Sequence, residues 1–266
     1  MYLVREPAGA GRRAAGGPGV GPALLLFLTE PARGLADLAA LPLAAPWLAR
    51  ARRGDGHGVL VLPGLLASDF STAPLRRFLC WLGYDVHGWE LGRNQGPTEA
   101  VRDGLPLALA ILAARAGGPV SLVGWSLGGI YARELAREHP HLVRHVITLG
   151  SPFAVTDLRR SRADGTYYRR SHLHAAGLPT REQVARPIGV PSTAVYSRHD
   201  GIVCWQNCVE PETALHQNVA VRCSHLGFGV DPATLWLIAE RLAAPPGQPG
   251  RFRPPAWLRP LYPGPR

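Results

Sequence analysis

Three residues whose types could together cleave an acyl bond, Ser126, Asp200 and His225, occur in that order along the chain. A serine hydroxyl becomes a nucleophile when a histidine takes its proton, and a carboxylate orients that histidine and stabilises its charged form. This chemistry requires no metal and no organic cofactor, and we expect neither. The three residues therefore predict acyl transfer through an acyl-enzyme on Ser126.

The residues around Ser126 read Gly-Trp-Ser-Leu-Gly-Gly over positions 124–129. An apolar, strand-like run at 120–123 precedes them, and a helix-like run follows at 130–138. A serine at so sharp a strand-to-helix turn takes a strained backbone conformation, and the flanking glycines remove side chains that would collide. The pattern predicts a nucleophile elbow, and an ordinary turn that contains a serine is the alternative.

Asp200 follows a buried-strand pattern at 192–197 and precedes Gly201, which is the position expected of the acid. His225 comes soon after a short strand pattern at 219–222. Asp157 is the alternative acid, because the acid can instead follow the preceding strand. Position favours Asp200, since Asp157 begins a polar segment.

The donors for an oxyanion are expected from the main chain. The apolar segment 58–62 reads as a strand covered on both faces, and it ends in Pro63-Gly64-Leu65. The N–H of Leu65 and the N–H of Leu127, one residue after the serine, can both point at a developing negative charge. The alternative for Pro63-Gly64 is an ordinary turn at the end of a strand.

The chain from about 58 to 242 resembles an α/β-hydrolase of the esterase/lipase type. The segment 124–129 is similar to that of bacterial lipases and of inositol-deacylase lipases, and 196–203 and 224–227 resemble the acid and histidine loops of such enzymes. The order serine, acid, histidine is also theirs. Two positions depart from the pattern: Pro63 replaces a common histidine, and Trp125 replaces a common histidine or tyrosine.

The resemblance implies an α/β fold with a mostly parallel central sheet, helices on both faces and a cap insertion. It also implies hydrolysis of a small-molecule or lipid carboxylic ester. An acyltransferase with the same three residues is one alternative, and a non-catalytic binding module of this fold is another. Trp89, Trp125 and Phe153 lie where ligands of open α/β sheets bind, so they are candidate substrate contacts. For Trp89 and its neighbour Asn94, a simple turn is the alternative.

The remaining pattern gives the elements that must position these residues. Further strands are expected at 84–88 and 143–149, and helices at 71–82, 99–114 and 231–242, the last with Asp231 as N-cap. We expect three regions: an N-terminal arm (1–57) that is disordered at first and then helical, a catalytic domain (58–244) and a loose Pro/Arg-rich tail (245–266).

In the arm, the spacing of Leu35, Leu38, Leu41 and Leu43 predicts amphipathic helices that pack beside the core. Residues 22–48 could instead attach the protein to a membrane surface, and a secretory signal is a further alternative. The apolar run at 22–28 is too short to span a bilayer. We expect a cytoplasmic protein, with membrane association and secretion left open and no expectation for its oligomeric state.

The segment 154–188 has no apolar period and is expected to cap the site. Its arginines either face solvent or favour anionic substrates or lipid surfaces. The residues concerned are Arg159, Arg160, Arg162, Arg169 and Arg170, around Tyr167 and Tyr168.

The chain of 266 residues carries a formal net charge of +10, a balance that normally suggests an anionic partner. All 29 basic residues are arginine, and alanine, glycine and proline abound, as in GC-rich coding. No nucleic-acid motif is present, so we expect no nucleic-acid binding. No histidine pair lies at metal-site spacing from further ligands, so no metal site is expected.

The four cysteines, at 80, 204, 208 and 223, allow either disulfides or free thiols. A bridge from Cys204 or Cys208 to Cys223 would join the acid loop to the histidine loop.

Overall fold

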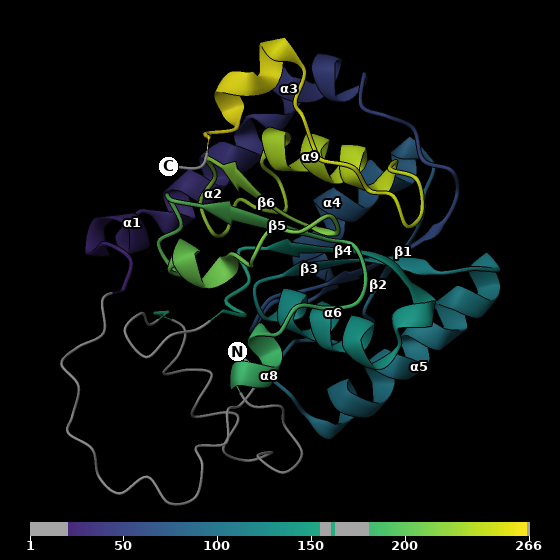
Figure 1. Cartoon of the computed structure of the whole chain (residues 1–266). Coiled ribbons are helices and arrows are strands. Elements are labelled where there is room, and N and C mark those ends of the chain that lie inside the picture. Colours follow the sequence, from purple (N-terminus) through teal and green to yellow (C-terminus); the bar gives the residue numbers. More distant parts are fainter. Residues whose placement is uncertain (1–20, 155–160, 163–180, 265–266) are drawn as a thin grey trace, which may run out of the picture.

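The computed structural model describes residues 21–154, 161–162 and 181–264 (Figure 1). Its centre is a six-stranded sheet in the order β2-β1-β3-β4-β5-β6, in which every neighbouring pair is parallel. All strands therefore end at the same edge, where the loops that follow them meet. The strands are β1 (Gly58–Leu62), β2 (Asp85–Gly88), β3 (Val120–Trp125), β4 (Val143–Leu149), β5 (Ser192–Ser197) and β6 (His216–Val221).

Helices cover both faces of the sheet, as Figure 1 shows, with α3, α4 and α9 on one face and α5, α6 and α8 on the other. The N-terminal helices α1 and α2 lie beside the end of the sheet that β5 and β6 form. The α-helices are α1 (Leu24–Leu28), α2 (Glu30–Ala39), α3 (Leu41–Leu48), α4 (Asp69–Leu82), α5 (Glu99–Ala116), α6 (Leu127–Glu138), α8 (Arg181–Ala185) and α9 (Pro232–Leu242). Short 3₁₀ helices are η1 (Pro140–Leu142), η3 (Trp205–Cys208) and η4 (Ala256–Leu261).

Alternating side chains of the strands enter two separate apolar cores. Leu60 and Leu62 of β1 face the core under α5 and α6, whereas Val59 and Val61 face the core under α4 and α9. Successive side chains of a strand point to opposite faces, so a strand covered on both sides must be apolar throughout. This is why β1 reads as an unbroken apolar run.

The helix ends follow their capping residues. Thr98 and Asp231 each accept a hydrogen bond from a main-chain N–H in the first turn, at 3.3 Å and 2.8 Å, and so begin α5 and α9. Gly117 ends α5 with φ of 65°, a conformation that glycine takes without a steric cost. The N-cap expected at Asp231 is confirmed.

The expectation of a loose C-terminal tail is wrong for the described part of the tail. Phe252 and Leu258 are buried in the core beneath α9, and the hydroxyl of Tyr262 donates to the carbonyl oxygen of Ala233 at 2.7 Å. Trp257 of η4 also meets Trp236 of α9 edge to face, with ring centroids 5.6 Å apart. The aromatic and leucine residues among the prolines therefore give the tail enough apolar surface to pack.

The arm packs against the domain, but not by the leucine face that the spacing suggested. Leu35, Leu38 and Leu43 are exposed, and only Leu41 of the four contributes to a core. The one buried residue of α2 is Glu30. The helix therefore presents its polar face to the protein, and this part of the expectation is wrong.

No helix among the described residues is both long enough and apolar enough to cross a bilayer. All four cysteines fall within the described ranges, and none of them forms a disulfide. Cys204, Cys208 and Cys223 are buried, and burial raises the pKa of the Cys208 and Cys223 thiols.

Candidate active site

Ser126 lies at the turn between β3, which ends at Trp125, and α6, which begins at Leu127. Its backbone has φ of 54° and ψ of −118°, a conformation that non-glycine residues rarely adopt. The Ser126 N–H donates to the carbonyl oxygen of Leu149 on the neighbouring strand at 2.8 Å, which holds the turn in place. The strain is thus maintained by the surrounding sheet and helix.

Glycines make this sharp turn possible. A side chain on Gly124 would collide with the backbone of the first turn of α6, and one on Gly128 would collide with the end of β1. The turn therefore packs backbone against backbone, and it carries Ser126 at the edge of the sheet where the strands end.

Asp200 and His225 form a close pair in the loops after β5 and β6. His225 Nδ1 lies 2.6 Å from Asp200 Oδ2, and both side chains are almost completely buried. The other oxygen of the carboxylate, Oδ1, accepts main-chain N–H bonds from Ile202 at 2.8 Å and Val203 at 2.7 Å. The acid is therefore fixed on both oxygens, and its contact with Nδ1 leaves His225 Nε2 available for proton transfer.

The charges near His225 raise its pKa above that of an ordinary histidine. Burial lowers this pKa, but the Asp200 carboxylate, through its charge and its hydrogen bond, and the Glu30 carboxylate outweigh burial. A histidine held in this way can accept a proton more readily than a free one. That is the property required of a general base.

The loop of His225 touches the turn of Ser126. The indole N–H of Trp125, one residue before the serine, donates to the carbonyl oxygen of His225 at 3.1 Å. Within the described part of the chain, no hydrogen bond joins Ser126 Oγ to His225. Such bonds are often long in unliganded enzymes and shorten when substrate binds.

The turn after β1 lies directly against the serine. A Cβ on Gly64 would be 3.2 Å from Ser126 Cβ, so only glycine fits there without pushing the two segments apart. No main-chain bond among the described residues uses the N–H groups of Leu65 or Leu127. Two main-chain donors are thus free beside Ser126, as an oxyanion site requires.

Asn94 holds this turn from inside the protein. Its side chain is fully buried, and its Nδ2 donates to the carbonyl oxygen of Pro63 at 2.9 Å. Its main chain accepts from the N–H of Leu66 at 2.7 Å and donates to the carbonyl oxygen of Ala67 at 2.8 Å. Asn94 therefore fixes both ends of the segment that contains Leu65.

The three candidate substrate contacts are buried at different places. Trp89 lies in the core on the α5 and α6 face, with its indole N–H on the Gly92 carbonyl oxygen at 2.9 Å. Phe153 lies in the same core, under the guanidinium of Arg133 at 3.9 Å from its ring centre. Trp125 contacts the loop of His225 through its indole N–H, whereas Trp89 and Phe153 belong to the core that also contains Leu127, the residue after Ser126. Contact with substrate stays a prediction for all three.

Sequence reasoning missed two carboxylates of α2, Glu30 and Asp37, which contact the histidine loop. Glu30 accepts from the main-chain N–H of His225 at 3.1 Å, and Asp37 accepts from the N–H of Ser224 at 3.1 Å. A signal was present in the sequence, because Glu30, Arg33 and Asp37 share one face of a helix at helical spacing. The leucine spacing of this segment draws attention to its other face instead.

Most of the expected cap lies outside the described residues. This applies to the alternative acid Asp157, to Arg159, Arg160, Arg169 and Arg170, and to Tyr167 and Tyr168. Arg162 is described, and its guanidinium donates to the carbonyl oxygen of Pro22 at 2.7 Å and lies over the ring of Phe27. Arg162 thus contacts the N-terminal arm.

Comparison with known proteins agrees with the fold described above. A family model for the alpha/beta hydrolase fold matches residues 69–172. The chain has the α/β-hydrolase fold. No curated protein sequence matches it.

Among solved structures, a lipase B from Aspergillus fumigatus is similar at a TM-score of 0.54 and 17% identity, over 74% of this chain. The present chain covers 55% of the length of that lipase. The structure reported for the metagenome-derived lipolytic enzymes LipS and LipT is similar at a TM-score of 0.49 and 17% identity, over 72% of this chain and 93% of that one. At 17% identity the likeness to the lipase shows the α/β-hydrolase fold alone.

Proposed function

We propose that the protein is a serine hydrolase that cleaves carboxylic esters through an acyl-enzyme on Ser126. The observation that carries the proposal is the convergence of four loops at one sheet edge. These loops bring together a strained serine, a buried acid–histidine pair at 2.6 Å and a main-chain turn with free N–H groups. A serine in an ordinary turn would not need this strain or a fixed acid behind the nearby histidine.

Each residue has a defined task in the reaction. His225 Nε2 takes the Ser126 proton while Oγ attacks the ester carbonyl, and Asp200 stabilises the resulting imidazolium. The N–H groups of Leu65 and Leu127 bind the tetrahedral oxyanion. The C–O bond to the alcohol then breaks as His225 returns the proton, and a water activated by His225 releases the acid.

The test is hydrolysis of p-nitrophenyl esters from C2 to C16 by purified wild-type protein and three variants. Ser126→Ala and His225→Ala should each lower kcat by on the order of 10⁴-fold or more while the fold persists. Asp200→Asn should also cause a large loss, since it disturbs the histidine tautomer. Wild-type activity in Ser126→Ala, or a loss in Asp157→Asn without one in Asp200→Asn, would contradict the assignment.

We also propose that residues 22–48 attach the protein to an anionic lipid surface. Leu24, Leu25 and Leu28 of α1 are exposed, and the chain carries a net charge of +10. Sedimentation with phosphatidylglycerol vesicles should exceed sedimentation with phosphatidylcholine vesicles, and replacing the three leucines by glutamine should reduce it. The control replaces Leu107 and Ile111, exposed residues of α5. An equal loss in the control, or no loss in either, would contradict this attachment.

A further inference from the structure

The carboxylate of Glu30 joins the acid loop to the histidine loop. Its Oε1 accepts main-chain N–H bonds from Gly201 at 2.7 Å and from His225 at 3.1 Å. Its Oε2 accepts the N–H of Leu226 at 3.1 Å. One side chain from the N-terminal arm thus binds the residue after the proposed acid, the proposed base itself and the residue after that base.

Glu30 is held firmly enough to act in this way. It is 2% exposed, and Arg33, one turn later on α2, donates to its Oε1 at 2.8 Å. Arg33 also donates to the carbonyl oxygen of His199 in the acid loop at 2.7 Å. A buried carboxylate is costly unless charge and hydrogen bonds compensate it, and here three amides and one guanidinium do so.

Other contacts of the N-terminal arm also join it to the acid loop and the histidine loop. Asp37, two turns after Glu30, accepts from both the N–H and the hydroxyl of Ser224, the latter at 2.7 Å. At the acid loop, Gly201 has no room for a side chain because the backbone at Leu26 lies against it. The arm therefore contacts both loops through backbone and carboxylate groups.

We propose that Glu30 is a positioning residue that sets the geometry and basicity of the Asp200–His225 pair from outside the catalytic domain. The loops after β5 and β6 are separate. At the end of β5, Ser197 Oγ joins them by accepting the N–H of His199 at 3.1 Å and donating to the carbonyl oxygen of Cys223 at 2.5 Å. Glu30 joins them next to Asp200 and at His225 itself. Displacement of a catalytic group by about 1 Å can cost roughly 100-fold in rate. This role rests on the serine hydrolase function proposed above.

Because Glu30 is charged, its role should be detectable in the pH dependence of kcat/KM. The charged and titratable groups on the elements around His225 are Arg198, His199 and Asp200 in the acid loop, Glu30, Arg33 and Asp37 on α2, and Asp231 at the end of the histidine loop. Burial lowers the pKa of His225, and of these groups Asp200 and then Glu30 are the ones whose charge raises it. Removal of the negative charge at position 30 should therefore move the acidic limb of the kcat/KM profile to lower pH, which a merely structural loss would not do.

The experiment compares Glu30→Gln and Glu30→Ala with the wild-type protein. Glu30→Gln keeps the size of the side chain but replaces one acceptor by a donor that faces the N–H groups. We expect kcat/KM to fall by about 10- to 100-fold, mainly in kcat, with the acidic limb displaced downward. Glu99→Gln, at an exposed position in the first turn of α5, is the matched control and should change neither.

A second readout does not depend on turnover. We expect the proton between His225 Nδ1 and Asp200 to give a far-downfield NMR signal that Asp200→Asn removes. Glu30→Gln should shift or broaden this signal, while Glu99→Gln should not. If wild-type protein turns over no ester, the proposed function fails, and this signal still tests Glu30. An unchanged signal with an unchanged acidic limb in Glu30→Gln overturns the inference, and so does loss of folding in both Glu30 variants.

Discussion

The helices α2 and α9 contact the rest of the protein through different kinds of surface: α9 through an apolar surface and α2 through a polar one. α9 buries nearly its whole length, including Leu235, Leu237 and Ile238, in the core that it shares with α4. α2 buries only Glu30, and its leucines remain exposed. Apolar area stabilises α9 without directional demands. α2 is instead held by hydrogen bonds to the loops of Asp200 and His225, so its attachment depends on the exact arrangement of those loops.

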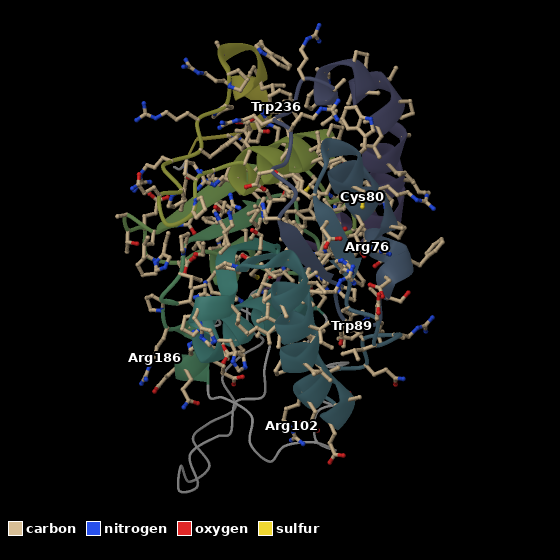
Figure 2. The ribbon with its side chains drawn as sticks, turned by 90° about the vertical axis from the view of Figure 1, so that its right-hand side faces the viewer. Arg76, Cys80, Trp89, Arg102, Arg186 and Trp236 are labelled. Carbon is tan, nitrogen blue, oxygen red and sulfur yellow. The ribbon has the colours of Figure 1, made fainter. Side chains whose placement is uncertain are left out.

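The difference predicts that substitutions in α9 change stability, whereas substitutions on the polar face of α2 change the site. The largest effect is expected at Trp236, which meets Trp47 of α3 at 5.8 Å and Trp257 of η4 at 5.6 Å between ring centroids. Figure 2 shows Trp236 far from Trp89, which belongs to the core on the other face of the sheet. Trp236→Ala should lower the free energy of unfolding by about 3–5 kcal/mol.

Urea denaturation would measure this loss, with Leu107→Ala on the exposed face of α5 as the control. The acidic limb of the kcat/KM profile should stay in place for folded Trp236→Ala. A shift of that limb would show that a substitution in α9 also changes the site, which contradicts the distinction between the two helices.

Acid should also lower the free energy of unfolding through a histidine on the α9 face of the sheet. His145 of β4 is buried beside Thr193, and burial, followed by the nearby Arg241 of α9, lowers its pKa to about 3. Unfolded chains bind a proton at this histidine below about pH 6.5, but the native state does not. The contribution of His145 to the free energy of unfolding should therefore be fully present above about pH 6.5. It should fall by about 1.4 kcal/mol per pH unit as the pH drops toward 3.

The comparison of wild type with His145→Gln in urea titrations at several pH values isolates this contribution. Glutamine does not titrate, so the variant should lose less stability on acidification. Parallel pH dependences would show that His145 is protonated in the native state.

A smaller effect is expected at Asp37 on α2. Asp37→Ala leaves the N–H and hydroxyl of Ser224 without their acceptor and should cost about 1–3 kcal/mol. Because Ser224 precedes His225, kcat should fall as well. The exposed Asp103→Ala serves as the control, and an equal effect on stability in both variants would argue against a specific contact.

The smallest effect is expected on the leucine face of α2. Leu35→Gln should change the free energy of unfolding by no more than about 0.5 kcal/mol, because Leu35 is exposed. The matched substitution Leu235→Gln in α9 should lower the free energy of unfolding far more than Leu35→Gln does, since Leu235 is buried in the core. A large loss in Leu35→Gln would mean that α2 is held by apolar packing after all.

The sequence was most informative where burial on two faces imposes an apolar pattern. The strands at 58–62, 143–149 and 192–197 were predicted with their observed bounds, because each is covered on both sides. β6 was predicted too short, since it begins with His216, Gln217 and Asn218 at the edge of the sheet, where polar residues are tolerated. A pattern of apolar residues does not indicate that such polar residues belong to a strand.

The arm shows a second limit of the sequence. A leucine stripe predicts an apolar face, but it does not predict that the opposite face will be the one in contact. Apart from the Ser224 hydroxyl, the groups that Glu30 and Asp37 bind in the histidine loop are main-chain N–H groups nearly 200 residues away in the chain, which carry no side-chain signal. The residues expected to do chemistry, by contrast, could be proposed because serine, acid and histidine each followed a readable strand.

The central claim is that Ser126 is a nucleophile activated by His225, and active-site labelling tests it most directly. Wild-type protein treated with a fluorophosphonate and analysed by peptide mass spectrometry should carry one phosphonyl group, on Ser126. Ser126→Ala should carry none, and His225→Ala should react slower by several orders of magnitude. Absence of labelling in folded wild-type protein, or labelling at another residue that persists in Ser126→Ala, would contradict the account.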